Sequence, residues 1–141
     1  ALPSGIKIAL SINTTYARIM GLFLLIFFLH SPISFAANIH HKEKEYQKLW
    51  CDQHNGEIEY VLDDRTRVDC LTEDYAIEFD FAYKWAEAVG QALYYAVKTN
   101  KKPAIVIIIE KEKRDQKNLK RLEILTEKYN IKLWTMTPSD L

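Results

Sequence analysis

The sequence predicts an α/β domain built around one sheet, and three observations carry that prediction. Residues 104–109 (AIVIII) form an unbroken apolar run dominated by β-branched residues, as in a strand that is covered on both faces. Residues 83–99 are rich in alanine and carry apolar residues at helical spacing. Three short segments between residues 57 and 81 alternate apolar and polar residues, which is typical of neighbouring strands in a meander.

The expected order is helix, three strands, helix, strand, helix, strand. The first helix ends at Asn55-Gly56, a common helix stop, and Asn100 to Pro103 closes the second helix. Gly90, within the second helix, is expected to mark a close approach to the sheet. In chain order the expected ranges are 38–54, 57–62, 66–71, 75–81, 83–99, 104–109, 119–129 after a charged stretch, and 131–136.

Length and composition indicate one globular domain. The chain has 141 residues, of which 48% are hydrophobic and 27% are charged. These values exclude collagen-like, disulfide-scaffold and wholly disordered chains. Lysine plus arginine and aspartate plus glutamate both number 19. The net charge therefore gives no indication of a nucleic-acid partner, and any basic site must be local.

Residues 1–36 have the form of a secretory signal peptide, which leaves residues 37–141 as a single domain. Basic residues precede a short apolar run at 19–29, and Ser34-Phe35-Ala36 supplies a small-x-small cleavage site. A membrane-spanning helix needs about 20 apolar residues, more than this run contains. An uncleaved membrane anchor is the alternative to a cleaved signal peptide. We therefore expect an exported protein, periplasmic or secreted, that associates with a membrane only if this segment is retained.

Cys51 and Cys70 are the only cysteines in the sequence. In an oxidising compartment this pair is a candidate disulfide, which would close a loop of about 20 residues and stabilise the fold by about 2–4 kcal/mol. Buried thiols are the alternative, and free thiols are expected if residues 1–36 are not a signal and the protein is cytoplasmic. The spacing lacks the CxxC or histidine partners of a zinc site.

Three carboxylates mark a candidate site. Glu78 and Asp80 lie two residues apart in one expected strand and so share a face, and Asp69 lies in the preceding strand. Converging carboxylates repel one another, and a hard cation with oxygen ligands, such as Mg²⁺, relieves the repulsion. Ordinary solvated acids at the end of a sheet are the alternative.

The helix after these strands carries a polar stripe. Lys84, Gln91 and Tyr95 fall on one helix face, and Lys84 stands at the end nearest Asp80. A cation, an amide and a phenol are therefore aligned beside the carboxylates. For Gln91 and Tyr95 taken alone, a half-buried polar boundary is the more common explanation.

Together these features resemble the PD-(D/E)XK, or restriction-endonuclease-like, nuclease superfamily. The resemblance rests on the order αβββαβ, an acid in the second strand (Asp69), the Glu78-Phe79-Asp80 segment in the third, and a Gln-x-x-x-Tyr helix (Gln91 and Tyr95). The last element resembles the bacterial recombination exonuclease branch. The resemblance covers residues 42–109, and it implies an αβββαβ core to which this chain adds a C-terminal helix and strand.

What the resemblance implies is metal-assisted hydrolysis of a phosphodiester bond, with Mg²⁺ or Mn²⁺ as the cofactor. Asp69 and Glu78 would be metal ligands. Members of the family often add an acid from the first helix, for which Glu45 is our first choice and Glu43 our second. In the later helix, the Gln-x-x-x-Tyr pair would orient the substrate or a water molecule.

The sequence departs from the family at Asp80, which stands where the family has a lysine. That lysine would position the attacking water and balance developing charge. Lys84, at the start of the next element, is placed to bring its ammonium group into the same space. The other two interpretations are that the site is degenerate, or that Asp80 is a further metal ligand.

Phosphate contacts require basic residues near the carboxylates. Arg65 and Arg67 precede Asp69, and Arg67 shares its strand face, so both are candidate substrate-binding residues. The basic residues between 111 and 121 alternate with acids and indicate a solvated helix face instead.

We therefore expect an exported protein with a nuclease-like fold that hydrolyses DNA with the help of Mg²⁺. The alternative is a scaffold that has lost catalysis and acts as a binding or interaction module of the cell envelope. Asp80 in place of lysine favours the alternative. The sequence does not indicate an oligomeric state.

Overall fold

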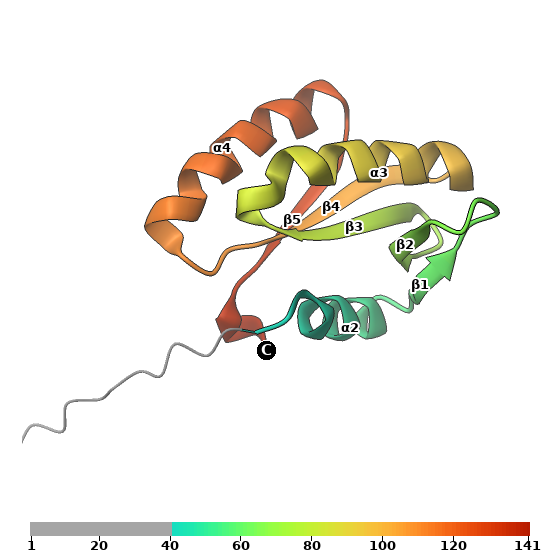
Figure 1. Ribbon diagram of the computed structural model, residues 1–141, viewed down its shortest axis with the longest axis horizontal. Helices are drawn as coiled ribbons and strands as arrows, with labels where there is room; N and C mark the ends of the chain where they lie inside the picture. Colours follow the sequence, from blue (N-terminus) through green and yellow to red (C-terminus); the bar gives the residue numbers. More distant parts are fainter. Residues whose placement is uncertain (1–40) are drawn as a thin grey trace, which may run out of the picture. The chain divides into compact units, whose positions relative to one another are not determined.

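The computed structural model describes residues 41–141, and it confirms an αβββαβ core followed by a further helix and strand (Figure 1). The expected signal segment, 1–36, lies outside the described residues. Within residues 41–141, no helix is long and apolar enough to cross a membrane. The elements are α2 (Glu43–Gln53), β1 (Glu57–Val61), β2 (Arg67–Leu71), β3 (Tyr75–Phe81), η1 (Ala82–Lys84), α3 (Trp85–Thr99), β4 (Lys102–Ile108), α4 (Glu112–Lys128), β5 (Lys132–Met136) and η2 (Pro138–Asp140).

The five strands form one mixed sheet in the order β1-β2-β3-β4-β5. β1, β2 and β3 pair antiparallel, whereas β3, β4 and β5 pair parallel. Each parallel connection passes through a helix, as parallel pairing requires. In the parallel half, Asp80 of β3 pairs with Ile107 of β4. The acidic end of β3 therefore lies at the edge where the parallel strands end.

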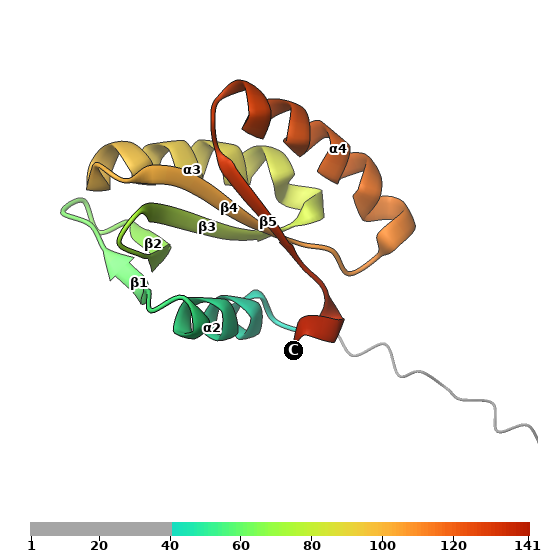
Figure 2. The same cartoon turned by 180° about the vertical axis from the view of Figure 1, so that it is seen from behind.

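Helices cover both faces of this sheet, α2 on one face and α3 with α4 on the other (Figures 1 and 2). On the α2 face, Tyr46 belongs to a buried cluster that includes Phe79 of β3. On the opposite face, Ala92 of α3 and Leu122 of α4 are buried in one cluster with Ile105 of β4. This double cover explains why the β4 sequence contains an unbroken apolar run.

A disulfide joins Cys51 of α2 to Cys70 of β2, which confirms the predicted pairing. The chain passes closest to this bond at Gly56. A Cβ atom added to Gly56 would lie 2.4 Å from the Cys70 sulfur and 2.6 Å from the Cys51 sulfur. Gly56 is therefore required by close packing against the disulfide.

The expectation of a close approach at Gly90 is wrong. A Cβ atom added there would meet no other group within 4 Å. Gly90 is exposed because it lies on the outer face of α3, while Ala88 and Ala92 are the small residues buried against the sheet.

Two helices begin well away from their expected positions. α2 begins at Glu43, later than the expected residue 38. α4 begins at Glu112, before the apolar spacing that starts at residue 119. Its first turn contains the buried Asp115, whose Oδ2 accepts hydrogen bonds from the backbone N–H groups of Glu110 and Lys111, at 3.1 and 2.8 Å. These hydrogen bonds, and the negative charge of Asp115 in the first turn, stabilise a helix start made of charged residues.

Candidate functional site

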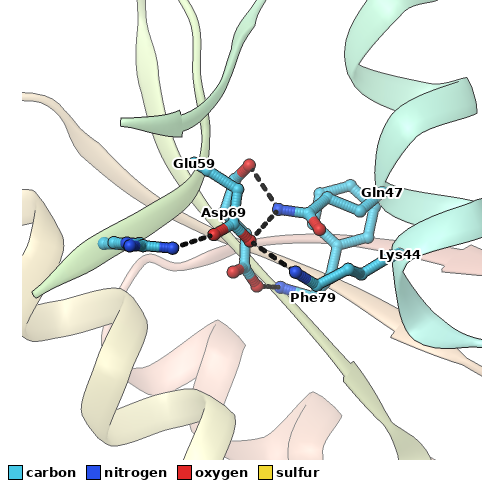
Figure 3. A network of polar contacts seen from close by, with 6 residues as sticks. Lys44, Gln47, Glu59, Asp69 and Phe79 are labelled. Carbon is cyan, nitrogen blue, oxygen red and sulfur yellow. Dashed lines mark hydrogen bonds and ion pairs between the residues drawn. The ribbon is translucent and has the colours of Figure 1, made fainter. Parts of the chain in front are cut away.

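Asp69 and Glu78 lie beside each other on neighbouring strands. The β2–β3 ladder pairs Cys70 with Ile77. One residue further along, Oδ2 of Asp69 accepts a hydrogen bond from the backbone N–H of Phe79 at 2.8 Å (Figure 3). The carboxylate of Asp69 thus takes the place of a strand partner, and this contact fixes its position next to Glu78.

Glu78 is almost completely buried, with 3% of its surface exposed. The side-chain amide of Gln91, on α3, donates a hydrogen bond to Oε1 of Glu78. Oε2 of Glu78 is buried and has no hydrogen-bond partner among the described residues. A buried carboxylate oxygen without a donor destabilises the fold unless a proton or a cation satisfies it.

Burial raises the pKa of both carboxyls. Desolvation raises the pKa of Asp69 to about 6, although the Phe79 amide opposes this change. Desolvation, followed by the charge of Asp69, raises the pKa of Glu78 far above its ordinary value. The raised pKa of Glu78 means that this carboxyl carries a proton at neutral pH. At neutral pH the pair therefore holds a proton that a divalent cation can displace.

A second pair of carboxyls, Asp80 and Glu43, adjoins the first. Asp80 is 2% exposed, and it lies close enough to Glu43, in the first turn of α2, to be influenced by the charge of that carboxylate. The Nζ of Lys84 lies 3.4 Å from Oδ1 of Asp80. Burial raises the pKa of Asp80 to about 7, although the Lys84 ammonium lowers it. A carboxyl with a pKa near 7 is suited to accepting and releasing a proton under physiological conditions.

Tyr95 faces the same carboxylates from α3. Its side chain is buried in a cluster with Val68 and Ala76. Burial raises its pKa, and the negative charges of Glu78 and Asp69 raise it further. The phenol therefore keeps its proton and presents a hydroxyl group near the carboxylate pair.

The structure adds a supporting network that our sequence interpretation missed. Gln47, buried on α2, donates from Nε2 to the backbone carbonyl of Asp69 at 2.7 Å and to Oε1 of Glu59 at 3.4 Å (Figure 3). Glu59 also pairs with Arg67, at 3.1 Å, and with Lys44, at 4.0 Å. Gln47 thus holds the main chain of Asp69 while Phe79 holds its side chain.

Glu59 occupies an uncommon backbone conformation, with a φ of 57° within β1. Left-handed φ values at residues other than glycine are typical of turns and functional sites. The three side chains that contact its carboxylate fix this residue in place beside the site.

Of the two acids considered in the first helix, Glu43 is the one that lies near the carboxylates. Glu45, our first choice, is exposed and pairs with His41 at 2.8 Å. Gln47 lies one helical turn after Glu43 and faces the same side, towards the sheet. The arginine candidates lie at the β1–β2 hairpin, where Arg65 is exposed in the turn and Arg67 is held by Glu59.

The carboxylates fit a hard divalent cation. The atoms that they offer to a metal are all oxygens, and one buried oxygen of Glu78 has no hydrogen-bond partner among the described residues. Among residues 41–141, no three histidine, cysteine, aspartate or glutamate side chains already surround a common position for a metal. Mg²⁺ commonly uses only one or two protein carboxylates and takes its other ligands from water and phosphate. Asp69 and Glu78 are the residues that would hold it.

Three of the grooves on the described part of the chain are lined by none of the carboxylates Asp69, Glu78 and Asp80. The largest, about 520 Å³, lies between the β1–β2 hairpin and the end of α3. The second, about 440 Å³, lies where β4 and β5 end. The third, about 290 Å³, is lined by aromatic residues that include Trp50 and Trp134.

One similar protein is "Putative KilA-N domain-containing protein L33" of Acanthamoeba polyphaga mimivirus. The two sequences are 32% identical over 92 residues, a match that covers 65% of this chain and 36% of that protein. The chain thus spans about a third of its relative. No family model matches the chain, and no solved structure gives a significant match. The PD-(D/E)XK resemblance therefore remains a prediction from sequence.

Proposed function

We propose that this protein is a metal-dependent deoxyribonuclease in which Asp69 and Glu78 hold Mg²⁺ or Mn²⁺. The observation that carries the proposal is the adjoining carboxyls of Asp69 and Glu78, because Glu78 is buried and one of its oxygens has no hydrogen-bond partner among the described residues. The order of elements and the sequence motifs support the same function. The name of the mimiviral relative states no activity, so the proposal rests on the residues of this chain.

Each residue near the pair has a part in the proposed reaction. A bound divalent cation would polarise the scissile phosphate and assist deprotonation of water. Gln91 keeps Glu78 in position through its hydrogen bond, and Gln47 does the same for Asp69. Lys84 supplies positive charge where the phosphate approaches, and Asp80 exchanges a proton near neutral pH.

DNA binding is proposed to use the basic residues of the hairpin. Arg65 is exposed, and Arg67 is only partly neutralised by Glu59 because most of its side chain (61%) remains accessible. Both guanidinium groups are able to bind phosphate oxygens. These contacts would be independent of sequence, as phosphate contacts generally are.

Export is the proposed location, to the periplasm or the medium. The disulfide between Cys51 and Cys70 supports it, because such bonds persist in oxidising compartments and are rare in the cytosol. Labelling of thiols in cells lysed directly into denaturant tests this, because both cysteines are buried in the folded protein. Absence of reaction at both cysteines agrees with export, whereas two reactive thiols contradict it.

A second function is favoured by one observation, the pairing of Lys84 with Asp80. The acid occupies the position of the family lysine and holds the ammonium group that would otherwise be available to a phosphate. A scaffold that has lost catalysis, and that binds a partner in the cell envelope, is consistent with this pairing. It predicts a folded protein without nuclease activity.

A cleavage assay separates the two functions. Linear and circular DNA are incubated with the full chain in Mg²⁺, in Mn²⁺ and in EDTA. The proposal expects metal-dependent degradation that is lost in Glu78→Gln and retained in the matched variant Glu57→Gln, since Glu57 is exposed on β1. Folded wild-type protein without activity, or equal activity in Glu78→Gln, would contradict the nuclease function.

A further inference from the structure

Tyr83 is a large aromatic residue in an unusual position, exposed beside the buried carboxylates. It lies in η1, directly before Lys84, and 54% of its surface is accessible. Its ring is parallel to that of Phe81, with 8° between the planes and 5.7 Å between the centroids. Phe81 in turn contacts the buried Tyr46 ring edge to face. The Tyr83 ring is therefore supported from within the core while much of it faces solvent.

Arg114, of α4, accompanies this ring. Its guanidinium carbon lies 5.7 Å from the centroid of Tyr83, a cation–π contact. Oδ1 of the buried Asp115 accepts a hydrogen bond from Nε of Arg114 at 2.9 Å. Asp115 also binds two backbone N–H groups, so its charge is shared, and 51% of the Arg114 side chain stays exposed. A fixed, accessible cation thus stands beside an accessible aromatic ring.

The two residues are brought together by the fold, since η1 contacts the start of α4 next to the end of β3 (Figure 1). The same end of β3 carries Asp80, and Lys84 pairs with it. An aromatic ring with neighbouring cations is the combination that proteins use to bind single strands, because bases stack on the ring and phosphates contact the cations.

We propose that Tyr83 and Arg114 bind an unpaired nucleotide of single-stranded DNA, whose base stacks on Tyr83 and whose phosphate contacts Arg114. This inference rests on the proposed nuclease function and specifies its substrate as a single strand or a frayed end. Bases inside a duplex are already stacked on their neighbours, so duplex DNA without free ends gains only the phosphate contact.

The experiment measures binding without cleavage. A fluorescein-labelled oligothymidine of about 15 nucleotides, a length typical of such sites, is titrated with the full chain in EDTA and followed by anisotropy. Tyr83→Ala is expected to weaken binding by about tenfold, as loss of one stacked base does. Tyr83→Trp is expected to bind as the wild type does, and Tyr129→Ala is the matched control because Tyr129, at the end of α4, is 55% exposed. Arg114→Gln should lower the slope of log affinity against log salt by about 0.7.

Equal affinity in Tyr83→Ala and wild type would overturn the inference, as would no binding by the wild type or an equal loss in Tyr129→Ala. Tighter binding to a blunt duplex of the same length would also overturn it. The outcome is separable from that of the nuclease proposal. Metal-dependent cleavage that is unchanged in Tyr83→Ala rejects only the proposed binding site at Tyr83 and Arg114. Binding of the single strand without cleavage rejects only the nuclease function.

Discussion

The ammonium nitrogen of Lys84 lies 3.4 Å from Oδ1 of Asp80, and this contact joins η1 to the acidic end of β3. The strand position that holds a lysine in the resembled nucleases here holds a buried acid. Lys84 brings a positive charge back to the same place from the next element, four residues later. Whether this arrangement replaces the family lysine is a question of function that substitution at Lys84 can answer.

Lys84→Ala is expected to reduce metal-dependent DNA cleavage by about 100-fold or more, the usual effect of removing one group that stabilises developing charge. Mg²⁺ affinity should be retained, because Lys84 is not a metal ligand. Cleavage rates and calorimetric titrations of the same preparation measure both effects. Lys48→Ala is the control, since Lys48 and Asp52 also form an ion pair four residues apart. Wild-type cleavage by Lys84→Ala would reject the role of the lysine.

The raised pKa values make folding dependent on pH. Because the folded protein holds protons on Glu78, Asp69 and Asp80 that the unfolded chain has released, stability falls as the pH rises from about 4 through about 6 for Asp69 and about 7 for Asp80, and it continues to fall above pH 7 because of Glu78. Urea titrations without divalent cations should therefore give a lower free energy of unfolding at pH 8 than at pH 5. Mg²⁺ should restore part of the difference at pH 8.

Glu78→Gln isolates the main contributor to this pH dependence. Removing the acid should decrease the difference in the free energy of unfolding between pH 5 and pH 8 by about 1–3 kcal/mol. Glu57→Gln should leave this difference unchanged, because Glu57 is exposed. Stability that increases from pH 5 to pH 8 in the wild type would contradict the assignment of protonated carboxyls.

Gln47→Ala tests the network that supports Asp69. The change leaves the Asp69 carbonyl without the 2.7 Å donor, and a buried acceptor without its partner costs about 1–3 kcal/mol of stability. Gln53→Ala, in the same helix but exposed, should change stability by no more than about 0.5 kcal/mol. Denaturant unfolding of both variants makes the comparison, and equal effects would show that the network is not stabilising.

Two glycine variants should have opposite effects. Gly56→Ala forces a Cβ atom against both sulfurs of the disulfide and should destabilise the fold by about 1–3 kcal/mol. Gly90→Ala adds a methyl group in open space within α3 and should stabilise it by up to about 1 kcal/mol. Thermal unfolding of the oxidised protein distinguishes them. A stable Gly56→Ala would contradict the close packing at the disulfide.

The order of elements was predictable because the periodicity of apolar residues is a local property of the sequence. The Cys51–Cys70 bond was predictable for a different reason, since no other pairing is available. Apolar spacing did not show where α4 starts, because its first turn contains no apolar residue and is held instead by the buried Asp115.

The site was only partly accessible to sequence reasoning. The choice between Glu43 and Glu45 depends on the rotation of α2 about its axis, which the burial of Tyr46 and Trp50 against the sheet determines. That apolar spacing was the signal that would have favoured Glu43. The contact between Gln47 and Asp69 joins residues 22 positions apart, and no local pattern predicts it.

A Mg²⁺ titration at neutral pH, repeated in two buffers of different ionisation enthalpy, tests the central claim most directly. If the Asp69–Glu78 pair holds a proton that the metal displaces, binding should release about one proton per site, and both binding and release should disappear in Asp69→Asn and Glu78→Gln. Asp52→Asn, on the exposed face of α2, should bind as the wild type does. Unchanged Mg²⁺ affinity in the two site variants, or no binding by the folded wild type, would contradict the assignment of the metal site.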